Sequence, residues 1–111
     1  MSVPVDPHEL AGTAAGHGPT AYLLTTGSDG RPRVNQVAPA IADNRISVAA
    51  GGSASRNAVD RPTVTVLWPP VDDDGFSLIA DGEAAVVGGP GPGATIEIVV
   101  TSAVLHRRSP D

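Results

Sequence analysis

The chain has 111 residues, 41% of them hydrophobic, with a formal net charge of -5, seven arginines, no lysine and no cysteine. This length predicts one domain over residues 1–111, and an acidic chain without lysine argues against a general nucleic-acid surface. The absence of cysteine excludes disulfides and thiolate chemistry and favours a reducing compartment, so we expect the cytoplasm. The first ten residues lack the regions of a signal peptide, and no apolar run is long enough to span a membrane. The hydrophobic residues are mostly Val, Ala, Ile and Leu, which favours strands over helices.

The N-terminal half of the chain predicts one short helix followed by three strands. Asp6 as N-cap, Pro7 at the first helical position and Glu9 at the third indicate a helix start. Residues 16–19 end that helix, and residues 1–5 are expected as a flexible end. The predicted strands cover residues 20–26, 32–41 and 46–50. Turn sequences at 28–31 and 42–45 separate these strands.

The C-terminal half predicts a second short helix and three further strands. Residues 53–60 have a serine cap and helical composition before Pro62. The predicted strands cover residues 63–68, 76–87 and 94–105. Asp81-Gly82 lies within the second of these and indicates a bulge rather than a turn. Residues 88–93 are expected as a flexible loop and 107–111 as a flexible end, which leaves a mainly β fold, a small antiparallel barrel of six strands with two short helices.

The histidines, serines and aspartates give little support for metal or hydrolytic chemistry. His8, His17 and His106 lie far apart without further ligands at metal-binding spacing, so no metal site is expected. No serine has the context of a nucleophile elbow, and the acidic run at 72–74 lacks the pattern of a calcium loop. The glycine-rich loop 88–93 lacks the lysine of a phosphate loop. We therefore name no catalytic residue.

One segment combines groups that can bind an anion. At residues 51–57, two glycines precede Ser53, Ser55, Arg56 and Asn57 at the start of the predicted second helix. Backbone amides at a helix start, hydroxyls and a guanidinium together suit a phosphate group. The alternative is that one serine caps the helix while Arg56 and Asn57 point to water.

The order of these segments resembles a known superfamily. A first strand that ends in Asp-Gly-Arg-Pro at 29–32 leads into a polar second strand at 33–37, and Ser-Arg-Asn-Ala at 55–58 precedes Arg-Pro-Thr-Val at 61–64. This combination resembles the pyridoxamine 5'-phosphate oxidase-like, FMN-binding split-barrel superfamily over about residues 8–106. The resemblance implies a six-stranded antiparallel Greek-key split β-barrel. It also implies a homodimer that binds flavin mononucleotide (FMN), or in some branches the deazaflavin coenzyme, between its subunits.

The resemblance also implies which residues contact the cofactor. Ser53, Ser55, Arg56 and Asn57 are the implied phosphate ligands. The implied contacts on the second strand, which runs along the flavin ring in the family, are Arg33, Val34, Asn35, Gln36 and Val37. Trp68 would form a wall of the pocket or of the dimer interface, with a position in the core or at a barrel corner as the alternative. Tyr22 is expected to face the core, which explains it without a catalytic role.

Two departures from the family limit the functional expectation. Ala54 stands where many cofactor-binding relatives have a lysine, and the chain lacks the arginine-rich C-terminal segment of true pyridoxamine-phosphate oxidases. Synthesis of pyridoxal phosphate is therefore not expected. The leading expectation is an FMN- or deazaflavin-dependent oxidoreductase that acts on a small organic acceptor. The alternatives are a dimer that binds the cofactor without turnover, and a cofactor-free structural module of the same fold.

Overall fold

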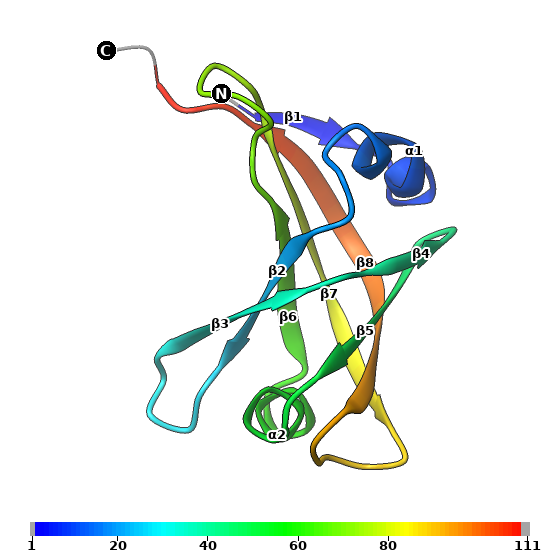
Figure 1. The fold of residues 1–111 in the computed structure, drawn as a ribbon, viewed down its shortest axis with the longest axis vertical. Coiled ribbons are helices and arrows are strands. Elements are labelled where there is room, and N and C mark those ends of the chain that lie inside the picture. Colours follow the sequence, from blue (N-terminus) through cyan, green and yellow to red (C-terminus); the bar gives the residue numbers. More distant parts are fainter. Residues whose placement is uncertain (1, 110–111) are drawn as a thin grey trace.

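The computed structural model describes residues 2–109, which form one antiparallel sheet curved into an open half-barrel (Figure 1). The strands are β1 (Ser2–Val5), β2 (Ala21–Thr26), β3 (Pro32–Val37), β4 (Ala40–Ala42), β5 (Arg45–Ala50), β6 (Thr63–Trp68), β7 (Ser77–Val87) and β8 (Ala94–His106). The strand order is β3-β2-β6-β7-β8-β5-β4, and β1 pairs with β8 beyond the end of β5. The mainly β, antiparallel architecture is confirmed.

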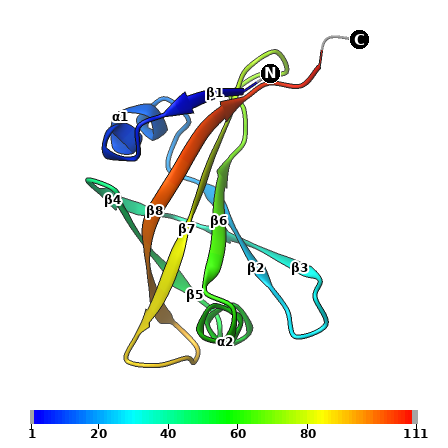
Figure 2. The ribbon, with the colours of Figure 1, turned by 180° about the vertical axis from the view of Figure 1, so that it is seen from behind.

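Two helical segments close the two ends of the half-barrel. A 3-10 turn, η1 (Pro7–Glu9), continues into α1 (Leu10–Ala15), and α2 (Gly52–Asp60) follows β5. Figures 1 and 2 show these helices at opposite ends of the sheet. Leu10 of α1 and Ala58 of α2 are buried in the core with the inward residues of the strands, so each helix seals one end of the core. No helix among residues 2–109 is long and apolar enough to cross a membrane.

The prediction of six strands was wrong, because the sheet has eight. The single strand expected at 32–41 is divided into β3 and β4, with Pro39 between them. Proline has no N–H for the ladder, which explains the interruption there. Residues 2–5, expected as a flexible end, form β1 and pair with residues 103–106 of β8. β8 extends beyond the end of β5 and leaves an unpaired edge there, which β1 covers.

The irregularity predicted at Asp81-Gly82 is confirmed, and its extra residue lies on the neighbouring strand. Asp81 pairs with Ser102 and Gly82 with Val100, so Thr101 of β8 has no partner in the register. A Cβ atom at Gly82 would overlap the Val99 carbonyl oxygen. Glycine therefore lets β7 and β8 approach closely where the long hairpin bends.

Local signals placed most turns and one of the two helix starts. The Asp6 side chain accepts a hydrogen bond from the His8 N–H, which confirms the predicted cap. Gly30 has a φ of 80° in the β2–β3 turn, a conformation that favours glycine. The serine cap predicted for the second helix is wrong. Helix α2 begins one residue earlier, at Gly52, with Gly51 as its N-cap and no side-chain cap.

Two histidines fasten the N-terminal helical segment to the sheet. His8 Nδ1 lies 2.6 Å from Asp43 Oδ1, in the turn between β4 and β5. His17 Nε2 lies 2.9 Å from the Phe76 carbonyl oxygen. The hydrogen bond with Asp43 and the charge of its carboxylate raise the pKa of His8.

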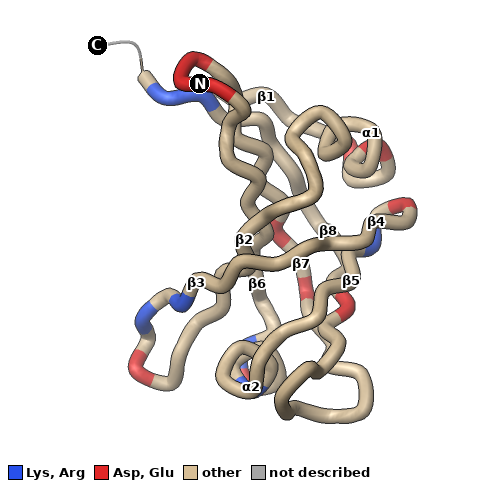
Figure 3. The backbone as a smooth tube through the Cα atoms, in the orientation of Figure 1, with Lys and Arg blue, Asp and Glu red and all other residues tan. Residues whose placement is uncertain are grey.

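Figure 3 shows charged residues in the β2–β3 turn, near the β4–β5 turn and near the C-terminal end, and also acidic positions within the sheet, where Asp81 and Glu83 lie in β7 and Glu97 lies in β8. The loop between β7 and β8, residues 88–93, contains neither helix nor strand, as predicted. Residues 107–109 follow β8 without helix or strand, whereas residues 110 and 111 of the expected flexible end lie outside the described residues.

Candidate functional site

The curvature of the sheet leaves a cleft between β3 and β5. These strands are separated in the strand order, yet they approach each other across the opening of the half-barrel. The cleft has a volume of about 280 Å³. It is lined by Asn35, Gln36, Val37, Ala49, Ala50, Gly51 and Gly93. Three of the residues expected to contact a cofactor ring therefore lie opposite the segment that leads into α2.

The five candidates on β3 are divided between the two faces of that strand. Val37 is buried in the core, whereas Val34 is 59% exposed on the outer face. Asn35 pairs with the buried Leu23, so it faces the same side as Val37, and Gln36 faces the same side as Val34. Alternation along a strand therefore prevents all five from touching one ring.

The start of α2 opens at one end of the cleft. Gly51 has an extended conformation and no side chain caps the helix, so the first backbone N–H groups lack side-chain partners. Ser53 is exposed there. The Arg56 guanidinium lies over Gly52, since a Cβ built at Gly52 would be 3.0 Å from Arg56 Nη1. This combination of free amides, a hydroxyl and a guanidinium fits a phosphate group.

The other two predicted phosphate ligands make contacts inside the protein. Ser55 has no exposed surface, and its hydroxyl contacts backbone atoms of Gly52 and Gly91. The Asn57 amide donates to the hydroxyl of the buried Thr25, 3.2 Å away on β2. Ser53 and Arg56 are thus the members of the predicted phosphate-binding set that are exposed, and of segment 51–57 only Gly51 lines the cleft itself.

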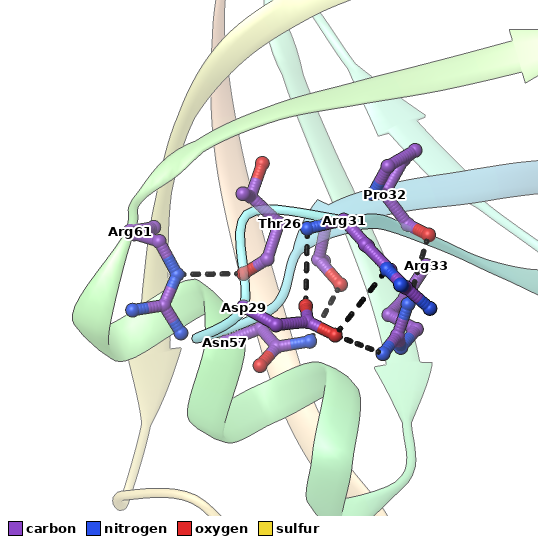
Figure 4. A network of polar contacts seen from close by, with 8 residues as sticks. Thr26, Asp29, Arg31, Pro32, Arg33, Asn57 and Arg61 are labelled. Carbon is purple, nitrogen blue, oxygen red and sulfur yellow. Dashed lines mark hydrogen bonds and ion pairs between the residues drawn. The ribbon is translucent and has the colours of Figure 1, made fainter.

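Arg33 belongs to a polar network at the β2–β3 turn (Figure 4). Its Nη2 donates to Asp29 Oδ2 at 3.0 Å. The pKa of Asp29 is lowered, first by the hydrogen bond from the Arg31 N–H and then by the charge of Arg33. Arg61 Nε donates to the Thr26 carbonyl oxygen at 2.7 Å, which ties the end of α2 to the same hairpin. Arg33 therefore stabilises the hairpin and does not line the cleft.

Trp68 and Tyr22 occupy positions that the sequence did not resolve. Trp68 is only 1% exposed and belongs to the core. It borders a separate hollow of about 410 Å³ between α1 and β4, not the β3–β5 cleft. Tyr22 was expected to face the core, and this is wrong, because the residues on either side of it, Ala21 and Leu23, are the buried ones.

The sequence did not indicate several of the residues that line the cleft. Ala49, Ala50 and Gly93 are small and carry no signal that would single them out. Within residues 2–109, no three side chains of His, Asp or Glu gather as a metal site would require. The arrangement offers backbone amides, the cation of Arg56 and glycines that let a ligand approach the backbone closely. These groups can bind a ligand.

Comparisons with known proteins place this geometry in a known fold. No protein-family model matches the chain. A structure of a protein from Clostridium acetobutylicum, described as related to a general stress protein of the pyridoxinephosphate oxidase family, matches with a TM-score of 0.73 and 8% identity over 94% of this chain and 92% of that one. A proposed pyridoxamine 5'-phosphate oxidase of Listeria innocua matches with a TM-score of 0.71 and 13% identity over 90% and 98% of the chains. An FAD-binding protein of Mesorhizobium loti matches with a TM-score of 0.69 and 14% sequence identity over 95% of this chain and 96% of that one.

These likenesses establish that the chain has the pyridoxamine 5'-phosphate oxidase-like split-barrel fold, as the sequence resemblance implied. At the level of sequence, it is 35% identical to uncharacterized proteins of Mycobacterium bovis and Mycobacterium tuberculosis. Both alignments span 101 residues and cover 80% of this chain and 71% of the relative. The chain belongs to the same family as these two mycobacterial proteins.

Proposed function

We propose that this chain is the subunit of a homodimer that binds a flavin or deazaflavin cofactor in the β3–β5 cleft and acts as an oxidoreductase on a small organic acceptor. The observation that carries the proposal is the position of the cleft, which joins the polar residues of β3 to the uncapped start of α2. A phosphate-bearing planar cofactor needs both ends of such a site. The FAD-binding neighbour of the same fold supports a flavin-type ligand.

The phosphate end of the proposed site consists of the first turn of α2 and Arg56. Arg56 is exposed, and among the described residues no hydrogen bond or ion pair engages its guanidinium. A charge-assisted hydrogen bond to phosphate would therefore not have to break an existing contact. Gly51 and Gly52 carry no Cβ, so a phosphate could approach the backbone amides closely.

The ring end of the proposed site consists of Asn35 and Val37, which face the same side of β3. The Asn35 amide can donate and accept hydrogen bonds at the edge of a heteroaromatic ring, and Val37 offers an apolar contact. A bound flavin would supply hydride chemistry. The part of this chain is to bind and orient the cofactor and to exclude water from its reactive face.

A second copy of the chain would complete the site and cover the outer face of the sheet. Cross-strand neighbours on this face form a continuous apolar band. Its successive cross-strand members are Tyr22, Leu67, Ile79 and Val104, and Leu24 adjoins Tyr22 on the same face of β2, opposite Thr65. Neither helix covers the band, because both helices bury their apolar residues in the core on the opposite side. All five side chains are partly exposed, and a partly exposed apolar sheet face of this kind is typical of a subunit interface.

Titration of the purified protein with FMN and, separately, with the deazaflavin coenzyme tests the proposal. Saturable binding of either compound at micromolar or lower concentration, by a dimer in light scattering, is the expected result. Reduction of the bound cofactor and its reoxidation by a small acceptor then test the oxidoreductase activity. Absence of binding to both compounds would refute the cofactor site.

One observation favours a second candidate, a dimer that binds the cofactor without turnover. Ala54, at the place where many cofactor-binding relatives have a lysine, is 2% exposed and packs in the core. The phosphate end of the cleft therefore relies on the single cation of Arg56. Bound cofactor that no reductant or acceptor can turn over would support this candidate, and sustained turnover would exclude it.

A further inference from the structure

Ser55 makes an unusual set of contacts for a serine within a helix. Its hydroxyl oxygen accepts a hydrogen bond from the Gly91 N–H at 3.1 Å. The same hydroxyl lies 3.1 Å from the Gly52 carbonyl oxygen and 3.4 Å from the Gly91 carbonyl oxygen. A hydroxyl has one proton, so it donates to one of these carbonyls at a time. Ser55 thus connects the first turn of α2 to the loop between β7 and β8.

The loop at residues 88–93 has few other means of keeping its position. It consists of glycines and two prolines, Pro90 and Pro92, which have no N–H. Gly88, Gly89 and Gly93 have φ values of 75°, 87° and 71°, a region in which glycine is favoured. Within the described residues, the side-chain hydrogen bonds to this loop come from Ser55. The loop otherwise has a backbone hydrogen bond from Ala94 N to Gly91 O at 3.2 Å.

The position of this loop matters because its last residue lines the cleft. Gly93 lies in the cleft wall together with Gly51, which caps α2. Ser55 therefore holds one wall of the cleft against the helix that forms its phosphate end. The hydroxyl itself is fully buried, so a ligand in the cleft does not reach it without a rearrangement of the loop.

We infer that Ser55 is a positioning residue that fixes the glycine-rich loop as a wall of the β3–β5 cleft, and not a ligand of the cofactor. The effect on the loop is independent of any ligand. The effect on cofactor affinity rests on the proposed function. A wall that is already in place lowers the entropic cost of binding, because the loop does not have to be ordered when the ligand arrives.

Amide hydrogen exchange in the ligand-free protein, followed by NMR, tests the first part. Ser55→Ala removes one oxygen and keeps α2 intact, since alanine is the stronger helix former. We expect the Gly91 amide to exchange about tenfold faster, as the loss of one hydrogen bond predicts, while amides in α2 and β2 keep their rates. Ser53→Ala, in the same turn but exposed, is the matched control and leaves Gly91 unchanged.

Unchanged Gly91 exchange in Ser55→Ala would overturn the inference, as would equal acceleration in α2 and β2, which reports general destabilisation. FMN titration tests the second part, with an expected increase in Kd of about fivefold in Ser55→Ala. Faster Gly91 exchange with an unchanged Kd for FMN would overturn the role of the loop in binding. If the unmodified protein binds neither FMN nor the deazaflavin coenzyme, the proposed function fails, while the exchange result still decides whether Ser55 holds the loop.

Discussion

Replacement of Gly82 by alanine tests the close approach of β7 and β8 at the bulge. A Cβ at this position would overlap the Val99 carbonyl oxygen and lie 2.7 Å from Ile98 Cγ2. The carbonyl belongs to the backbone and cannot rotate away, so one of the two strands must move. Overpacking of this kind costs about 3 kcal/mol. Alanine loses less conformational entropy on folding than glycine does, which offsets about 0.5–1 kcal/mol of that cost. We therefore expect Gly82→Ala to lower the free energy of unfolding by about 2 kcal/mol.

Urea denaturation followed by the fluorescence of Trp68, the single buried tryptophan, measures this change. The expected loss corresponds to a denaturation midpoint lower by about 1 M urea, and to a Tm lower by about 8 °C. Gly12→Ala is the matched control, because nothing lies within 4 Å of a Cβ built at Gly12 in α1. The free energy of unfolding of Gly12→Ala should rise by about 0.5–1 kcal/mol, whereas that of Gly82→Ala should fall. All proteins are compared at one concentration. A Gly82→Ala protein as stable as the unmodified one would show that β7 and β8 do not approach closely at Gly82.

Three further predictions concern the site, the interface and the N-terminal segment. Arg56→Ala should weaken FMN binding by about 2 kcal/mol, roughly 30-fold, through loss of a charge-assisted hydrogen bond. Arg45→Ala, away from the cleft, should leave FMN binding unchanged. Equal effects of the two variants in an FMN titration would contradict the role of Arg56. Leu67→Asp should convert the dimer into monomers in light scattering, and a persistent dimer would show that the interface lies elsewhere. NMR titration should find the pKa of His8 above its ordinary value, and Asp43→Asn should lower it. The contact between His8 and Asp43 then stabilises the fold fully at a pH below the ordinary histidine pKa, and this stabilisation is lost as the pH rises through the raised pKa of His8. A free energy of unfolding that does not change with pH across this range would contradict this role of His8.

Runs of β-favouring residues between turn sequences located most of the strands, because both signals depend on neighbouring residues alone. The run at 63–68 alternates between buried and partly exposed residues and forms β6 as predicted. The Asp-Gly pair at 29–30 specified the first hairpin, since Gly30 adopts the positive φ that the turn requires. Asp6 and Pro7 likewise placed the first helix start.

The sequence identified the region of the candidate site but not the direction of its side chains. It singled out the segment 51–57, and the structure places the start of that segment in the cleft. Ser53 and Ser55 are equivalent in local sequence, yet one is exposed and the other is buried against Gly91. Only the packing of α2 against a loop 36 residues further along the chain distinguishes them.

Composition and local patterns were enough to predict a small antiparallel β protein with short turns and a bulge near Gly82. They also single out a segment before the second helix as a candidate anion site, which stays a prediction. Only the folded structure shows that β1 pairs with residues 103–106 of β8, that Trp68 is buried and that β3 approaches β5. Turns and short strand-forming runs depend on residues within a few positions of one another. Edge pairing and the cleft depend instead on the curvature of the whole sheet, which results from contacts between distant strands.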